Sequence, residues 1–140
     1  AGQGAFVNDR RLRVSGRRNM ADSLFATGIP FLGHGDATEH TKFSNELQKI
    51  MAVSAGVRRF GSAALDLAYV AAGRYDGFWE RGLNSWDIAA GILLVREAGG
   101  FVSDFASRDR ALYSGDVVAA NPSIHAELLK CLNGTNENHA

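Results

Sequence analysis

Apolar runs of strand length alternate with segments of helical periodicity from about residue 23 onward. Strands are predicted at residues 23–27, 57–60, 78–80, 101–103 and 117–120. The first of these runs is closed by Gly28 and Pro30, which is typical of a buried strand that ends in a loop. Farther upstream, two short strands at residues 4–7 and 12–14 around a polar turn predict a hairpin.

Segments with the apolar period of a helix lie between these strands. Helices are predicted at residues 41–55, 63–72, 86–98 and 122–132. Ser62 is a typical N-cap for the second helix, and Asn121 is one for the fourth, with Pro122 at its first position. The third helix is apolar nearly all the way round, so we expect it to be buried, with Trp79 and Trp86 in the core. This alternation predicts an α/β layered sandwich, in which helices pack on a sheet.

The composition narrows the class of protein. A chain of 140 residues suits one domain, which we place at residues 1–132, with a disordered tail at residues 133–140. The 15 acidic and 15 basic residues cancel, so the overall charge favours neither nucleic acid nor an anionic membrane surface as a partner. No apolar run approaches the roughly 20 residues that a membrane span needs.

Cysteine and histidine usage favours neither a disulfide nor a zinc site. Cys131 is the single cysteine, so no intrachain disulfide can form, and we expect a cytoplasmic location. The four histidines lack the spacing of zinc ligands, and packing or surface roles are expected for His34, His40, His125 and His139. The first residues of the chain, from Ala1, lack the features of a signal peptide, and we expect a further segment upstream.

Two acidic residues are candidates for chemistry. Asp87 lies in the first turn of the third predicted helix, where an isolated acid most often only interacts with the helix dipole. A carboxylate held there in a fixed direction also suits Mg²⁺, which prefers hard oxygen ligands. Glu80 ends an aromatic strand, where it is either a solvated strand end or a hydrogen-bond acceptor for a ligand.

Cationic and amide groups precede these acids along the chain. Arg58 and Arg59 form an adjacent pair, and a guanidinium can bind phosphate oxygens through two parallel hydrogen bonds. The turn that follows, Gly61-Ser62-Ala63, starts a helix whose first backbone N–H groups can face an anion or a hydroxyl group. A solvated arginine pair and an ordinary helix start remain the plain alternatives.

A longer pattern joins these residues. The run WDIAAG at residues 86–91 is followed by an apolar helix and by EAGG at residues 97–100. This pattern resembles the C-terminal signature of the inositol monophosphatase family, most closely of its bacterial SuhB-type members. The resemblance covers nearly the whole chain, because residues 4–8 also look like a hairpin of that family. It implies the C-terminal half of the inositol monophosphatase and sugar phosphatase fold.

The resemblance also implies roles for individual residues. Asp87 matches a magnesium ligand of the family, and Glu80 matches a glutamate that accepts hydrogen bonds from a substrate hydroxyl. The residues that would line the substrate pocket are Arg58, Gly61, Ser62 and Ala63. The resemblance implies a homodimer and leaves the role of Arg59 open, with a subunit contact as the candidate. The implied reaction of the complete protein is Mg²⁺-dependent hydrolysis of inositol 1-phosphate or a related polyol phosphate.

One departure limits what this chain can do alone. The family's metal-binding glutamate and its Asp-Pro-x-Asp-Gly-Thr segment do not occur among these residues. We therefore predict no catalytic residue beyond the ligand Asp87, and an inactive fragment. Where inositol-specific relatives have a serine, this chain has Ile29-Pro30, which weakens the expectation of strict inositol specificity. Sugar bisphosphates and adenosine phosphosulfate nucleotides stay open as substrates, as does a non-catalytic role with the transcription and ribosomal RNA machinery.

Overall fold

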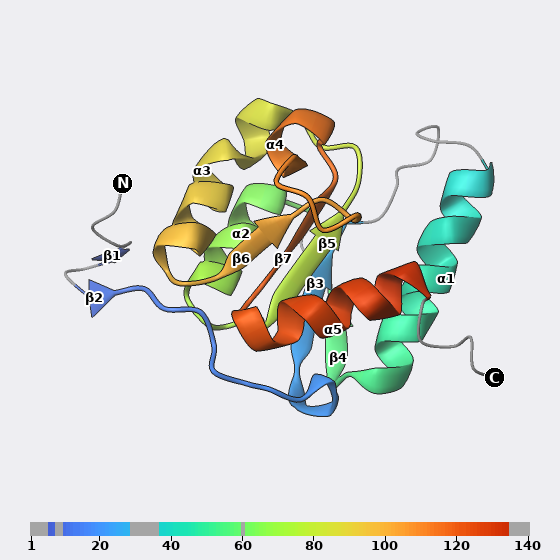
Figure 1. Cartoon of the computed structure of the whole chain (residues 1–140), viewed down its shortest axis with the longest axis horizontal. Coiled ribbons are helices and arrows are strands. Elements are labelled where there is room, and N and C mark those ends of the chain that lie inside the picture. Colours follow the sequence, from blue (N-terminus) through green and yellow to red (C-terminus); the bar gives the residue numbers. More distant parts are fainter. Residues whose placement is uncertain (1–5, 8–9, 29–36, 60, 135–140) are drawn as a thin grey trace.

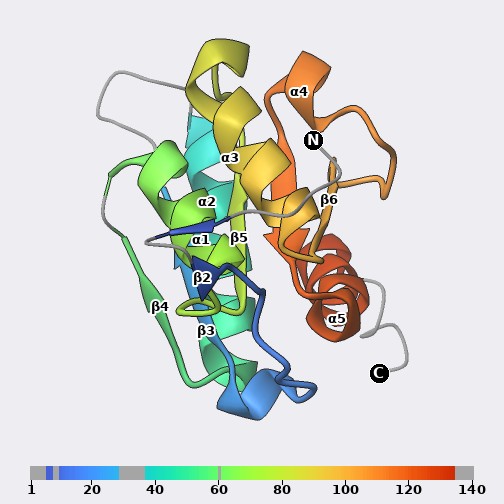
Figure 2. The same ribbon diagram turned by 90° about the vertical axis from the view of Figure 1, so that its left-hand side faces the viewer.

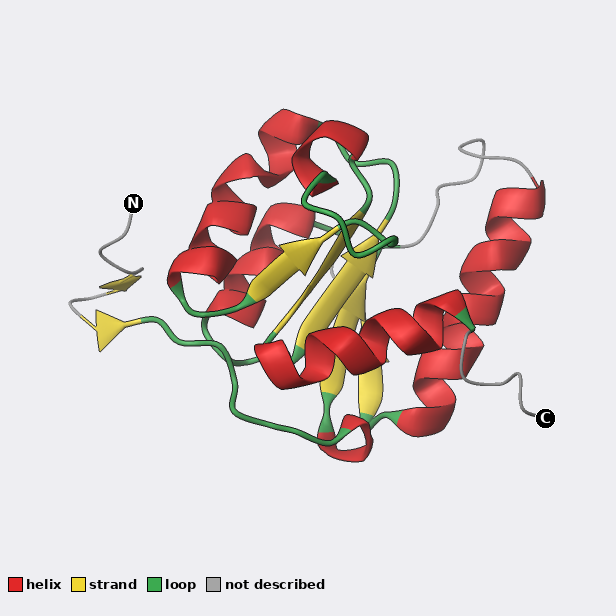
Figure 3. Ribbon diagram, in the orientation of Figure 1, coloured by secondary structure: helices red, strands yellow, loops and turns green. Residues whose placement is uncertain are grey.

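The computed structural model describes residues 6–7, 10–28, 37–59 and 61–134, and these form a mixed sheet with helices on both faces (Figure 1, Figure 3). The strands are β1 (Phe6–Val7), β2 (Arg10–Arg11), β3 (Leu24–Thr27), β4 (Gly56–Arg58), β5 (Gly77–Glu80), β6 (Phe101–Ser103) and β7 (Val117–Ala120). The helices are α1 (Ala37–Val53), α2 (Ala63–Ala71), α3 (Ser85–Glu97), α4 (Ala111–Ser114) and α5 (Pro122–Asn133), with a 3₁₀ turn, η1, at Met20–Asp22. The predicted layered α/β fold is confirmed.

The main sheet has five strands in the order β4-β3-β5-β7-β6. Strand β3 pairs in parallel with β4 and with β5, whereas β7 runs antiparallel to both β5 and β6. The carboxyl ends of β3, β4, β5 and β6 therefore lie together at one end of the sheet, which we call its carboxyl edge. Helices α2, α3 and α4 cover one face, and α1 and α5 cover the other (Figure 1). Figure 2 looks onto the α2 and α3 layer, with α1 behind the sheet.

The alternation of side chains along each strand divides the core in two. On β3, Phe25 packs with α1 and α5, and Ala26 packs with α2 and α3. On β5, Trp79 lies on the α1 and α5 side, and Phe78 lies on the opposite side. Because side chains alternate with a period of two, Glu80 faces the same side as Phe78.

The two predicted helix caps are confirmed. The Ser62 hydroxyl accepts a hydrogen bond from the Leu65 amide at 3.2 Å, which caps α2. The Asn121 side chain accepts one from the Ile124 amide at 2.8 Å, which caps α5 ahead of Pro122. Each cap satisfies a backbone N–H that has no acceptor within its own helix, and each therefore fixes where the helix begins.

The expected burial of the third helix is wrong. Trp86 is 78% exposed and Leu93 is 49% exposed, although Trp79 is buried as predicted. Helix α3 packs against α2 through a single stripe, and the buried residues of that stripe are Ile88, Gly91, Ile92 and Val95. Its other face is not covered by any part of the chain that the structure describes, and apolar composition alone cannot reveal which face has a partner.

Smaller differences concern element bounds. The hairpin forms, but its second strand is Arg10–Arg11 rather than residues 12–14, with Val7 opposite Arg10. Helix α1 begins at Ala37, earlier than predicted, and the short elements η1 and α4 were not predicted. The predicted loop at residues 29–36, the strand end at Phe60 and most of the predicted tail lie outside the described residues.

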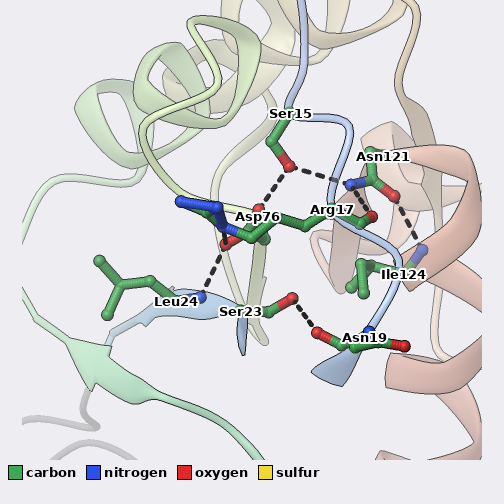
Figure 4. Close-up of polar contacts among 8 residues, drawn as sticks. All are labelled: Ser15, Arg17, Asn19, Ser23, Leu24, Asp76, Asn121 and Ile124. Carbon is green, nitrogen blue, oxygen red and sulfur yellow. Dashed lines mark hydrogen bonds and ion pairs between the residues drawn. The ribbon is translucent and has the colours of Figure 1, made fainter. Parts of the chain in front are cut away.

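A buried aspartate anchors the segment that precedes β3 (Figure 4). Asp76, at the amino end of β5, accepts hydrogen bonds from the Leu24 amide at 2.7 Å and from the Ser15 hydroxyl. Arg17 lies 3.4 Å from the same carboxylate. Asn121 donates to the Ser15 hydroxyl at 3.0 Å and to the Arg17 carbonyl at 2.9 Å. This network occupies the amino edge of the sheet, opposite the edge where the candidate site residues lie.

Candidate functional site

The residues singled out from the sequence lie on elements that end or begin at the carboxyl ends of the parallel strands, although the Arg58 guanidinium lies back along its own strand, 3.5 Å from the Val57 carbonyl oxygen. Arg58 ends β4 and Glu80 ends β5. The turn at residues 61–63 joins β4 to α2, and Asp87 lies in the first turn of α3. In open α/β sheets, ligands bind in the crevice outside the carboxyl ends of parallel strands. The topology therefore brings the predicted metal ligand and the predicted substrate contacts to the position where such a fold binds ligands.

The same residues also share one face of that edge. Val57 packs with Phe25 on the α1 and α5 side, so Arg58 next to it faces the α2 and α3 side. Glu80 faces that side as well, and its carboxyl group fills the space beside Gly28. A Cβ atom at Gly28 would lie 2.2 Å from Glu80 Oε1, so a larger residue there would require the Glu80 carboxyl group to move. Gly28, which the sequence marked only as the end of a strand, thus lies against the Glu80 carboxyl group.

The turn into α2 combines a left-handed glycine with the free amides of a helix start. Gly61 has a φ of +81°, a conformation that side-chain-bearing residues rarely adopt. Ser62 uses its hydroxyl group for the Leu65 amide, while the amides of Ala63 and Ala64 have no acceptor within the helix. These amides carry the positive end of the helix dipole, so the turn can receive an anion or a hydroxyl oxygen.

The start of α3 is held by a neighbouring loop. The Gly82 amide donates to Asp116 Oδ1 at 3.0 Å, and the Leu83 amide donates to the Gly115 carbonyl at 2.9 Å. The approach is close, because a Cβ atom at Gly115 would lie 2.2 Å from the Leu83 carbonyl oxygen. Asp87 is exposed on this anchored turn. These contacts fix the backbone that leads into α3, and the Asp87 carboxylate projects from the first turn of that helix.

Asp66 on α2 is a buried acid that the sequence analysis did not single out. It is 1% exposed, and neither of its carboxylate oxygens has a hydrogen-bond partner in the described part of the chain. Burial raises the pKa of Asp66 to about 6. Burial and then the Asp66 charge raise the pKa of Glu80 to about 7. The sequence contained a signal for this burial. Asp66 precedes Val70 by four residues, so it lies on the apolar face of the predicted helix.

We expect these two carboxyl groups to make the chain less stable as the pH rises. Their folded-state pKa values exceed the ordinary values of 3.8 and 4.5, so the folded state holds protons that the unfolded chain has released. The free energy of unfolding should therefore fall between about pH 4 and pH 7. Asp66→Asn should make the free energy of unfolding less dependent on pH. At about pH 8 it should raise that free energy by about 1–2 kcal/mol, measured by urea unfolding.

Asp104→Asn is the matched control for that measurement. Burial of Asp104 favours its neutral form, but the Arg108 and Ala106 amides and the Arg108 guanidinium outweigh burial and lower the pKa of Asp104. Stability from Asp104 is thus present above its ordinary pKa and is lost on acidification, so this variant should be destabilised at about pH 8. If the free energy of unfolding of Asp66→Asn falls with pH as steeply as that of the parent protein, the raised pKa of Asp66 is not the cause of the fall.

The described residues do not form a closed metal site. Among residues 6–7, 10–28, 37–59 and 61–134, no group of three or more His, Cys, Asp or Glu side chains could hold a metal ion. Mg²⁺ is commonly held by one or two carboxylates together with substrate oxygens and water. Asp87, as a carboxylate on a fixed turn at the ligand-binding edge, fits a single ligand in such a set.

Two further observations concern features expected from composition. His125 is buried and its Nε2 lies 2.8 Å from the Ser103 hydroxyl, which agrees with the predicted packing role. Within the described residues, no helix is both long and apolar enough to cross a membrane.

A five-stranded mixed sheet between two helix layers defines a layered α/β protein, with acidic and cationic residues at the carboxyl ends of its parallel strands. The chain belongs to the inositol monophosphatase family, whose sequence model matches residues 1–137. An inositol-1-monophosphatase of Mesorhizobium japonicum is 59% identical over 131 residues, which are 94% of this chain and 48% of that protein. The Nus factor SuhB of Pseudomonas aeruginosa is 50% identical, over 91% of this chain and 47% of that protein.

Solved structures agree with this assignment. The extragenic suppressor protein suhB of Bartonella henselae is 50% identical with a TM-score of 0.88, over 98% of this chain and 51% of that one. The inositol monophosphatase of Anabaena is 40% identical with a TM-score of 0.85, over 95% of this chain and 54% of that one. The chain thus spans about half the length of the relatives it matches, and the family resemblance seen in the WDIAAG and EAGG runs is confirmed.

Proposed function

We propose that the full-length protein that carries this chain hydrolyses a phosphate monoester with Mg²⁺, and that inositol 1-phosphate or a related polyol phosphate is the substrate. The observation that carries this proposal is that β4 and β5, which end at Arg58 and Glu80, and α3, which begins two residues before Asp87, share one end of the sheet. Membership of the inositol monophosphatase family and the name of the Mesorhizobium relative support it.

Each residue of the edge has a separate task in this proposal. Asp87 holds a magnesium ion, which when bound polarises the phosphoryl group and lowers the pKa of a coordinated water. Arg58 donates hydrogen bonds to phosphate oxygens, and the amides at residues 61–63 orient the substrate. Glu80 binds a substrate hydroxyl group, beside the space that Gly28 leaves open.

The identity of the alcohol group rests on Glu80. A partly buried carboxyl group next to a phosphate site favours a substrate with free hydroxyl groups close to its phosphate ester. Sugar bisphosphates and adenosine phosphosulfate nucleotides also carry hydroxyl groups, so they are the alternatives to inositol 1-phosphate. Values of kcat/KM for these three substrate classes, measured with one preparation, would rank them.

Phosphate release by the full-length protein tests the proposal. We expect release from inositol 1-phosphate that rises with Mg²⁺ concentration to saturation and stops when the ion is chelated. A protein that is folded, as shown by circular dichroism, and that releases no phosphate from any of the three substrate classes would refute the proposal.

A second function is favoured by the names of several relatives. Proteins about 50% identical to this chain are named Nus factor SuhB, which points to work with the transcription machinery. On this alternative, the protein binds RNA polymerase or its factors, and hydrolysis is incidental. Retention of RNA polymerase by the immobilised full-length protein, undiminished in an Asp87→Asn variant, would support it.

We also propose a cytoplasmic homodimer, with Arg59 at the contact between subunits. Arg59 is exposed and follows β4, which is an edge strand of the sheet. Sedimentation of the full-length protein at micromolar concentration would separate dimer from monomer, and an Arg59→Ala variant would test the position of the contact.

A further inference from the structure

An ion pair ties the residue that follows β5 to helix α1. Arg81 Nη1 donates a hydrogen bond to Glu46 Oε2 at 2.5 Å. The Glu46 side chain is 4% exposed and the Arg81 side chain is 30% exposed, so this contact, which we call the buried pair, lies largely out of water. A charge-assisted hydrogen bond fixes both the distance and the direction between its two groups. The buried pair therefore defines where the end of β5 lies relative to α1.

A second contact holds the same guanidinium. Arg81 Cζ lies 3.7 Å from the centroid of the Phe105 ring, within the range of a cation–π interaction. Phe105 belongs to the loop after β6, and its carbonyl oxygen accepts a hydrogen bond from the Asn133 side chain of α5 at 2.9 Å. Arg81 thus connects the end of β5 to α1 directly and to α5 through Phe105.

These contacts lie on the side of the sheet opposite the candidate site. Trp79 and Phe105 belong to the core on the α1 and α5 side, and Arg81 follows Trp79 by two residues on that same side. Glu80, between Trp79 and Arg81, faces α2 and α3. Because Arg81 follows Glu80 directly in the chain, an anchored Arg81 fixes the backbone from which the Glu80 carboxyl group projects.

We propose that Arg81 is a positioning residue that acts through Glu80: the buried pair, on one side of the sheet, sets the position of the Glu80 side chain on the other. Apolar burial is non-directional, so it holds the strand against α1 without fixing where the last residue of the strand lies. A buried ion pair commonly adds no more stability than apolar residues of similar volume, so directional precision is what this pair supplies. The inference rests on the proposed function and adds a residue to it.

The first test removes the buried pair without leaving a charge buried. In the full-length protein, Glu46→Leu combined with Arg81→Met should keep the midpoint of urea unfolding at or above that of the parent protein. KM for inositol 1-phosphate should rise about fivefold, the effect of one misaligned hydrogen bond, while kcat stays within about twofold. A pair with only a structural role would leave KM unchanged in a variant of parental stability.

Two further variants serve as rescue and control. Glu46→Gln keeps an acceptor for Arg81 and should hold KM within about twofold of the parent value. Glu46→Gln combined with Arg81→Met removes that contact, so it should raise KM about fivefold and replaces the first double variant if the latter unfolds. Arg96→Met is the matched control, because Arg96 pairs with Asp109 at 2.6 Å on the surface, and KM should stay within about twofold.

A second measurement does not depend on activity. Glu80 and Val117 face each other where β5 ends, and Gly77 and Ala120 face each other where it begins. Amide hydrogen exchange, followed by NMR, should be about fivefold faster at Glu80 and Val117 in the double variants and unchanged at Gly77 and Ala120.

Two results overturn the proposal. One is a parental KM in a folded variant that lacks the contact between residues 46 and 81, and the other is unchanged exchange at Glu80 and Val117. If the parent protein releases no phosphate from inositol 1-phosphate, the proposed function fails. The exchange measurement then decides by itself whether the buried pair fixes the end of β5.

Discussion

Asp87→Asn in the full-length protein should lower kcat by roughly a hundredfold or more, equivalent to about 2.7 kcal/mol of barrier. Asparagine keeps the shape of the side chain but removes the negative charge from the metal. Asp87 is exposed, and α3 packs through Ile88, Ile92 and Val95, so the free energy of unfolding should change by about 1 kcal/mol or less. Values of kcat against Mg²⁺ concentration, with the melting temperature, measure both effects.

Asp109→Asn is the control for loss of a surface carboxylate. Asp109 is also exposed, and its side chain pairs with Arg96 at 2.6 Å in a loop that carries no proposed role. This variant should keep kcat within about twofold of the parent, as expected for an exposed pair. An Asp87→Asn variant that melts like the parent and keeps its rate and its magnesium response would remove Asp87 from the site.

The fragment formed by residues 1–140 should release no phosphate from inositol 1-phosphate, even at saturating Mg²⁺. One aspartate holds Mg²⁺ poorly, and the described residues contain no group of three or more side chains that could hold a metal ion. The family's Asp-Pro-x-Asp-Gly-Thr segment, which by resemblance supplies further ligands, does not occur in the sequence. Colorimetric phosphate detection on the purified, folded fragment measures this.

The full-length protein assayed beside the fragment is the positive control. Phosphate release by the fragment that is lost in Asp87→Asn would show that these residues alone make a working site. That result would contradict the division of the metal site between this chain and the rest of the protein.

Local signals explain why most elements could be predicted. Strands β6 and β7 have the predicted bounds, and the caps at Ser62 and Asn121 fix the starts of α2 and α5. Each of these signals acts within about four residues. The order of the strands, with β7 between β5 and β6, depends on contacts between residues far apart in sequence, and so does the exposure of Trp86. The local pattern of hydrophobic residues predicts neither the strand order nor this exposure.

The candidate site, too, could be predicted only where local sequence patterns were sufficient. Arg58, Glu80 and Asp87 were selected by motif, and the parallel strands explain why residues so far apart in sequence meet at one edge. Asp66 was missed because an acid within an amphipathic helix looks solvated until its face is known. The contacts from Gly82 and Leu83 to the loop before β7 were missed because they join segments about 30 residues apart.

A crystal structure of the full-length protein with Mn²⁺ in place of Mg²⁺ tests the central claim most directly, because anomalous scattering locates the ion independently of any assay. Mn²⁺ accepts the same hard oxygen ligands as Mg²⁺. We expect an anomalous peak about 2.0–2.3 Å from a carboxylate oxygen of Asp87, at the carboxyl edge of the sheet. Bound ions that all lie away from Asp87, in a protein that still releases phosphate, would contradict the claim that this residue is a ligand of the catalytic metal.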